Sequence, residues 1–297
     1  MLGFLSLFGL LIPSACIRQW LYPELLFLVD MQDADLDRVV EELIKRDLRA
    51  KARVAISVAI KDVLMTSKTR IVRVADLEKV PKTYIGSRVE IELRHALGLV
   101  KGSDLDYSVC GVSVDCKHTI GRSWMIPREA LGKICLLVKT DYDNANCFSV
   151  KIGRILPEML PPSENKDGKK SLRYTHEDLR ELVLDEDLPP NFYKYLSPDQ
   201  LSDIFDPNLG AARRLAKLFS SFPSTPIPRS VIEDVAGQKD YMKRVRRNGG
   251  AQDFLAHHEI LWGGEEKAKI KLIILGLPLI GKDEFIAIPH TPDVWPK

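Results

Sequence analysis

One short segment in the first half of the sequence carries acids and a lysine at the spacing of β-strands. Two runs of strand-forming residues flank Cys110-Gly111, and a glycine at the second turn position suits the positive φ that a two-residue hairpin requires. This turn predicts that Asp106 lies opposite Asp115, with Lys117 on the same face because side chains alternate along a strand. The other face is expected to be packed and carries Tyr107, Val109, Val112, Val114 and Cys116.

The two opposed aspartates favour a site for a divalent cation. Like charges directly across a sheet are destabilising by about 0.2–1 kcal/mol, so Asp106 and Asp115 need a compensating cation. Carboxylates that converge on one point suit Mg²⁺, which takes oxygen ligands and keeps several waters for a substrate, and Lys117 would lie beside the ion. The alternative is a solvated hairpin with a polar outer face, and the hairpin residues alone leave both interpretations open.

The segment before the hairpin offers a third acid. Residues 86–98 carry an apolar stripe at helical spacing and end in a glycine, which predicts a helix. Glu90 borders the buried stripe more closely than Glu92 does. Glu90 is therefore either one half of a surface ion pair with Arg94, four residues later, or an acid at the buried edge with a chemical role.

Length and composition describe a globular protein of ordinary kind. The 297 residues favour two domains, and 45% hydrophobic with 28% charged residues supply a sizeable core and a soluble surface. A net charge of +2 excludes little, because a nucleic-acid-binding protein needs a basic patch and not a basic total. Five cysteines without a C-x-x-C pair predict neither a disulfide framework nor a thiolate zinc site. We expect reduced, mostly buried thiols in a cytoplasmic protein.

Residues 1–30 differ in composition from the rest. A signal peptide would need basic residues before its apolar core, and the sequence has none there. A membrane span would need about 20 uninterrupted apolar residues, and Pro13 and Arg18 interrupt the run. We interpret this part as a dispensable extension or a misassigned start, with the functional chain beginning at Met31, and expect no membrane association.

From residue 31 to 160 the patterns predict helices packed on a mixed sheet, the α/β class. The run 133–138 is continuously apolar, as in a central strand that is buried on both faces. Further patterns predict helices at 31–65, 75–79 and 86–98 and a strand at 147–155.

The second half begins with a stretch that resembles a linker. Residues 157–170 are rich in proline and charge, and we assign the linker to 161–172 and a mainly α second domain to 173–297. Helices are expected at 175–184 and from Ser197, where Pro198 takes the first helical position.

Within the second domain the patterns predict a helix-turn-helix. Helices are expected at 209–219, 228–236 and 238–247, with a turn at Gly237 before the third. The runs 260–264 and 269–275 suggest a hairpin of the kind that forms a wing. The third helix is basic and stops at a polar turn, and we assign DNA contacts to Lys239, Lys243, Arg244, Arg246, Arg247 and Asn248. A solvated basic helix is the alternative.

Several segments resemble a known family. The stretch Tyr84-Ile-Gly-Ser-Arg-Val-Glu-Ile-Glu-Leu, the stretch Gly111-Val-Ser-Val-Asp-Cys-Lys117 and Trp124-Met-Ile-Pro are similar to the catalytic domain of the NaeI-type type II restriction endonucleases, within the PD-(D/E)xK nuclease superfamily. Residues 235–251 resemble the second, CAP-like winged-helix domain of that family. One departure is Glu92, where the family pattern tolerates asparagine.

The resemblance implies Mg²⁺-dependent hydrolysis of double-stranded DNA at a specific palindrome. It implies that Glu90, Asp106 and Asp115 are the acids of the metal site and that Lys117 lies near the attacking water. It also implies that the second domain binds an additional, effector copy of the site, and that a cognate methyltransferase protects the host DNA. A palindrome presents two-fold related strands, so we expect a homodimer. The alternatives are a non-catalytic winged-helix regulator with a decayed nuclease domain and a repair or nicking endonuclease of the same superfamily.

Overall fold

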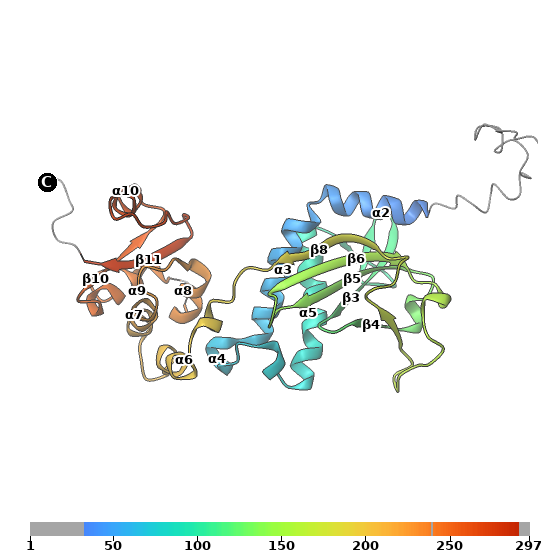
Figure 1. Cartoon of the computed structure of the whole chain (residues 1–297), viewed down its shortest axis with the longest axis horizontal. Helices are drawn as coiled ribbons and strands as arrows, with labels where there is room; N and C mark the ends of the chain where they lie inside the picture. Colours follow the sequence, from blue (N-terminus) through green and yellow to red (C-terminus); the bar gives the residue numbers. More distant parts are fainter. Residues whose placement is uncertain (1–32, 239, 291–297) are drawn as a thin grey trace, which may run out of the picture.

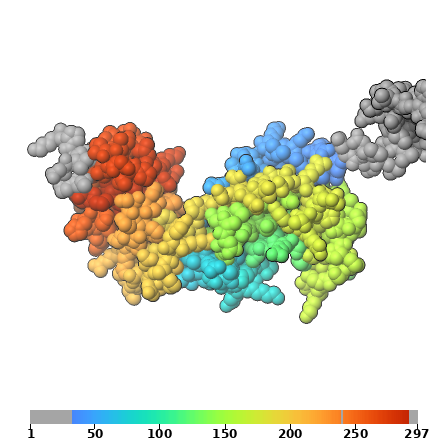
Figure 2. All heavy atoms as spheres, viewed as in Figure 1, coloured from blue at the N-terminus to red at the C-terminus, as the bar shows by residue number. Residues whose placement is uncertain are grey.

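The computed structural model of the protein describes residues 33–238 and 240–290. Two units follow each other along the chain and form distinct lobes (Figures 1 and 2). The expected extension at 1–30 lies outside the described residues. Among the helices that the structure describes, none is long and apolar enough to cross a membrane.

The first unit is built on a six-stranded sheet, which confirms the expected mixed α/β architecture. Its strands run in the order β1-β2-β3-β5-β6-β8. The β3–β5 pair is parallel and the other neighbours are antiparallel, so the sheet is mixed. The strands are β1 (Val100–Lys101), β2 (Tyr107–Val109), β3 (Val112–Thr119), β5 (Ile134–Asp141), β6 (Cys147–Arg154) and β8 (Arg180–Asp187).

Helices cover one face of this sheet. The expected helical region 31–65 is two helices, α2 (Ala34–Lys45) and α3 (Leu48–Leu64), because Asp47 adopts a left-handed conformation with φ 59° between them. The short α4 (Thr66–Thr69) and η2 (Val74–Asp76) lead to α5 (Lys79–Leu97). Apolar residues every fourth position bury one side of α5, and Gly98 ends it with φ 61°, as predicted.

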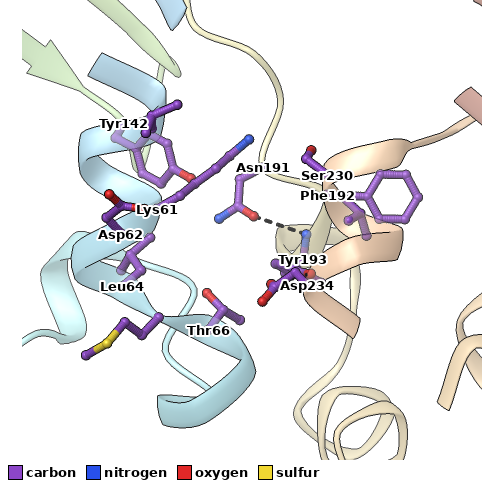
Figure 3. Close-up of a pocket in the computed structure, with 13 residues that line it drawn as sticks. Lys61, Asp62, Leu64, Thr66, Tyr142, Asn191, Phe192, Tyr193, Ser230 and Asp234 are labelled. Carbon is purple, nitrogen blue, oxygen red and sulfur yellow. Dashed lines mark hydrogen bonds between the residues drawn. The ribbon is translucent and has the colours of Figure 1, made fainter. Parts of the chain in front are cut away.

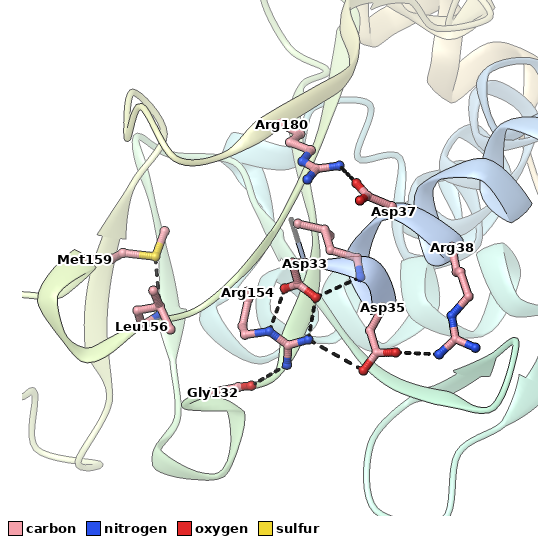
Figure 4. Close-up of polar contacts among 10 residues, drawn as sticks. Asp33, Asp35, Asp37, Arg38, Gly132, Arg154, Leu156, Met159 and Arg180 are labelled. Atoms are coloured by element: carbon pink, nitrogen blue, oxygen red, sulfur yellow. Dashed lines mark hydrogen bonds and ion pairs between the residues drawn. The ribbon is translucent and has the colours of Figure 1, made fainter. Parts of the chain in front are cut away.

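The start of α2 is fixed to the sheet by ion pairs (Figure 4). The Asp33 carboxylate caps α2 by accepting from the Leu36 N–H at 3.0 Å. The same carboxylate accepts from Arg154 Nε at 2.6 Å and Nη2 at 2.8 Å. Because Arg154 lies on β6, this bidentate pair holds the first described helix against the sheet.

The other face of β5 is covered by a two-stranded ribbon. Strand β4 (Ser123–Ile126) pairs with β7 (Lys170–Arg173). The indole of Trp124 is fully buried and donates to the Val138 carbonyl at 2.8 Å. The central strand β5 is thus buried on both faces, as its apolar run predicted.

The linker assigned to 161–172 is corrected by this topology. Strand β7 pairs with β4 in the ribbon, and β8 is the sixth strand of the main sheet, so the chain remains in the first unit beyond residue 180. The helix expected at 175–184 is also wrong, because residues 180–187 pair with β6. Composition does not separate a linker from a long surface loop between strands. Leu188 belongs to the core of the first unit and Phe192 to that of the second, which places the passage between them.

The second unit is mainly helical around a small sheet. The structure has η5 (Phe192–Tyr195), α6 (Pro198–Ile204), α7 (Ala211–Ser221), α8 (Arg229–Ala236), α9 (Met242–Val245), η6 (Ala251–Phe254) and α10 (Glu266–Ile274). Its sheet has the order β10 (His258–Trp262), β11 (Glu284–Pro289) and β9 (Ile227–Pro228). The predicted helices at α6, α7 and α8 and the turn at Gly237, with φ 65°, are confirmed.

Two expectations for this unit are wrong. The third helix, expected over 238–247, is the single turn α9. The second strand of the expected wing, 269–275, is part of helix α10, and β10 pairs with β11. A short run that alternates lysine with apolar residues is ambiguous between strand and helix, and here the burial of Ala268 and Leu272, four residues apart, follows the helical period.

The two units meet across polar contacts and a cavity. Asn191 Nδ2 donates to the Val72 carbonyl at 2.9 Å, and the Lys194 ammonium binds the Tyr142 carbonyl. A cavity of about 300 Å³ lies at this junction, lined in part by Tyr142, Asn191 and Asp234 (Figure 3). The junction is therefore only partly packed.

Candidate active site

The acidic hairpin has the predicted turn and register. Cys110 and Gly111 both have positive φ, 51° and 78°, as in the two-residue turn that matches strand twist. Val109 pairs with Val112, and Tyr107 pairs with Val114. Continued by one position beyond the Tyr107–Val114 pair, this register places Asp106 opposite Asp115.

The predicted division into a packed and a chemical face is also confirmed. The apolar side chains of the hairpin enter the core beneath α5. Asp115 is on the other face, yet it is only 4% exposed because β3 is an inner strand paired with β5. A buried carboxylate needs a charged or hydrogen-bonded partner.

Lys117 is that partner. Its Nζ lies 2.5 Å from Asp115 Oδ2. Burial raises the pKa of Asp115, and the hydrogen bond and charge of Lys117 oppose this rise. The nearby Asp106, within hydrogen-bonding reach of Asp115, raises the pKa of Asp115 further. Burial opposes the charged form of Lys117 as well, but the bond to Asp115 outweighs it and raises the pKa of the ammonium. Lys117 is therefore held protonated and oriented beside the two aspartates.

Asp106 is fixed by the neighbouring strand. Its Oδ2 accepts from the backbone N–H of Cys116 at 2.7 Å. Cys116 lies between Asp115 and Lys117 in the chain, so this bond holds Asp106 against the strand that carries the other two groups. The expected cluster of Asp106, Asp115 and Lys117 is present.

Glu90 faces this cluster and Glu92 does not. Burial first, and then the charge of Asp106, raise the pKa of Glu90. Glu90 Oε1 is also 3.7 Å from Arg94 Nη1, so the ion pair that the sequence offered is present, and it lies at the partly buried edge beside the aspartates. Glu92 instead pairs with Arg88, with Oε1 at 2.6 Å from Nη2.

The donor chemistry of the cluster fits a hard divalent cation. Within the described parts of the chain, no three or more His, Cys, Asp or Glu side chains gather closely enough to hold a metal alone. Asp106 and Asp115 nevertheless bring two crowded carboxylates together, and Mg²⁺ is commonly held by one or two carboxylates with waters and substrate phosphates completing its shell. Glu90 lies at the border of such a site.

One neighbour of the cluster was not identified from the sequence. Cys135, on β5 beside Asp115, has its Sγ 3.8 Å from Asp115 Oδ2. The sequence indicated only that this thiol is buried. The four cysteines that the structure describes are free. The position of Cys135 beside Asp115 could not be found without the register of β3 and β5.

The basic segment of the second unit is a tight loop around α9. Lys243, Arg246, Arg247 and Asn248 are exposed, and Arg244 is half-buried. Lys239 lies outside the described residues. The loop after α9 is closed by Asp253, which accepts from the backbone N–H of Gly249 at 2.6 Å. Lys243 and Arg244 lie in the single turn α9, and Arg246, Arg247 and Asn248 follow it in the loop.

The fold and the site together define a class of protein. A six-stranded mixed sheet flanked by helices, with two aspartates and a lysine on one hairpin, is consistent with a nuclease. The family model of the restriction endonuclease NaeI matches residues 37–292. The chain is 33% identical over 227 residues to the type II restriction enzyme NaeI of Lentzea aerocolonigenes, covering 73% of this chain and 70% of that protein. The chain belongs to the NaeI family of restriction endonucleases.

Proposed function

We propose that this protein is a site-specific endonuclease that hydrolyses phosphodiester bonds of double-stranded DNA with Mg²⁺. The observation that carries the proposal is the cluster of Asp106, Asp115 and Lys117 on one hairpin, with Glu90 facing it, in a member of a restriction endonuclease family. Nicking or repair chemistry would use the same groups, and the form of the DNA products separates these activities.

In this mechanism the acids bind the cation and the lysine stabilises charge. Asp106 and Asp115 would hold Mg²⁺, with Glu90 as the third acid. When bound, the ion lowers the pKa of a coordinated water and neutralises charge on the phosphate. Lys117, kept protonated by Asp115, donates hydrogen bonds to the attacking water or to the phosphate oxygens as negative charge grows on them.

The test is cleavage of unmethylated plasmid DNA with Mg²⁺. We expect discrete linear fragments from the wild type, and a rate at least about 100-fold lower from Lys117→Ala and Asp115→Ala. Glu90→Gln and Glu92→Gln form a matched pair on one helix, and only Glu90→Gln should abolish cleavage. Intact plasmid with wild-type protein that binds DNA would favour the non-catalytic regulator, and open circles alone would favour a nicking enzyme.

We propose further that the second unit, with helices α7 and α8 and the turn at Gly237, acts as a helix-turn-helix domain that binds an additional DNA site. The contacts proposed are Lys239, Lys243, Arg244, Arg246, Arg247 and Asn248. A homodimer would match a palindromic site, and a methyltransferase of the same specificity would protect the host. Addition of a short duplex that carries the recognition site should accelerate cleavage of a plasmid with one site. Unchanged cleavage would count against an effector site.

A further inference from the structure

Tyr107 is a buried hydroxyl placed between the acids of the hairpin and the helix that carries Glu90. Its side chain is 0% exposed, within the core beneath α5. The hydroxyl donates to the backbone carbonyl of Glu90 at 2.9 Å. A carbonyl oxygen has two lone pairs, so this bond adds to the hydrogen bond of the helix itself.

The position of Tyr107 in the chain connects this bond to the other acids. Tyr107 follows Asp106 directly, and it pairs with Val114, which directly precedes Asp115. Its hydroxyl also lies within hydrogen-bonding reach of the Cys116 thiol, whose own backbone N–H holds Asp106. Tyr107 is therefore linked to all three acids. Its side chain binds the Glu90 carbonyl, and its backbone adjoins Asp106 in sequence and pairs with the residue before Asp115.

The acids themselves oppose this arrangement. Glu90 and Asp106 carry like charges, and the charge of Asp106 disfavours the ionised form of Glu90. The charges of Arg94 and Lys117 offset only part of this effect, so the spacing of Glu90 from the aspartates needs support from uncharged contacts. The bond from Tyr107 to the Glu90 main-chain carbonyl supplies such a contact without occupying a carboxylate oxygen of Glu90.

We propose that Tyr107 is a positioning residue that sets the separation of Glu90 from the two aspartates and thereby tunes the affinity of the site for its divalent cation. This inference rests on the proposed function, because it assumes that the acids bind a cation. A hydroxyl that merely satisfied its own hydrogen bond in the core would affect stability and leave cation affinity unchanged.

The test compares Tyr107→Phe with Tyr142→Phe. Both tyrosines are buried in the same core, but the Tyr142 hydroxyl has no hydrogen-bond partner among the described residues. Metal-free protein is titrated with Mn²⁺ by calorimetry, and the Mg²⁺ concentration at half-maximal cleavage is measured in parallel. We expect Tyr107→Phe to weaken Mn²⁺ binding and raise the Mg²⁺ requirement by about tenfold, with a smaller loss of rate at saturating Mg²⁺. Tyr142→Phe should match the wild type.

A second measurement keeps the inference testable if Tyr107→Phe is poorly stable. Hydrogen exchange of the amides of α5 around Glu90, in metal-free protein, should be faster in Tyr107→Phe than in Tyr142→Phe. Unchanged Mn²⁺ affinity, or unchanged exchange, would overturn the positioning role. If the wild type itself neither binds Mn²⁺ nor cleaves DNA, the proposed function fails instead.

Discussion

The acidic hairpin and the basic loop around α9 reach their geometry by different routes. In the hairpin, a turn of two residues and the alternation of side chains place the aspartates together, and the register is the one that the residue types predict. In the basic loop, a run expected to form a helix over 238–247 forms one turn and then a loop closed by Asp253. Local rules thus determine the first region, and contacts with later residues determine the second.

The largest loss of stability is expected from Gly250→Ala, which tests the contacts that shape the basic loop. A Cβ at Gly250 would lie 2.0 Å from the carbonyl oxygen of Arg246, which is backbone and cannot move aside easily. We expect a loss of about 1–3 kcal/mol of stability, with weaker DNA binding by the second unit. Urea unfolding and a DNA-binding assay measure both effects. Gly210→Ala, where a Cβ meets nothing within 4 Å, is the control, and an equal loss in both variants would contradict this explanation.

A smaller loss is expected from Gly111→Ala in the hairpin. No atom lies within 4 Å of the added Cβ, so only the positive φ of 78° penalises the substitution. The left-handed conformation costs an L-residue about 1–2 kcal/mol, which urea unfolding can measure. Gly111→Asn should lose less, because asparagine tolerates this conformation. The reverse order of the two variants would show that the turn does not control the hairpin.

In the basic loop, Arg246→Ala tests whether the exposed cations contact phosphate. We expect weaker DNA binding and a slope of affinity against salt that is shallower by about one. Lys217→Ala serves as a control, because the Lys217 ammonium is already paired with Asp203 at 3.2 Å. A slope that Arg246→Ala leaves unchanged would count against this loop as a phosphate-binding element.

The smallest effect is a pH dependence at the hairpin. Burial and the charge of Asp106 raise the pKa of Glu90 on folding, so the folded protein binds this proton more tightly than the unfolded chain does. Ionised Glu90 therefore destabilises the metal-free fold at neutral pH. Glu90→Gln should raise its melting temperature by about 1–2 °C at pH 8. This gain in melting temperature should disappear as the pH falls below 4.5, the ordinary pKa of a glutamate. A gain that grows at low pH would show that folding lowers the pKa of Glu90 instead.

The same distinction between local and distant contacts explains which helices and strands were predicted. Helix α5 ends at Gly98 because glycine adopts the left-handed conformation, and β5 is buried on both faces because its run is apolar throughout. The helix expected at 175–184 failed because residues 180–187 are hydrogen-bonded to β6, some thirty residues earlier in the chain. The linker at 161–172 failed for the same reason.

By itself, the sequence determined the hairpin, its register and the shared face of Asp106, Asp115 and Lys117, because turn geometry and side-chain alternation act over a few residues. The sequence favoured Glu90 over Glu92 only through the apolar stripe and the family resemblance. The tertiary structure shows the difference directly, because α5 packs with Glu90 beside the aspartates and Glu92 paired with Arg88. It also decided the bond from the Tyr107 hydroxyl to the Glu90 carbonyl, which joins groups 17 residues apart. Such contacts follow from the packing of whole elements, and no local pattern in the residues encodes them.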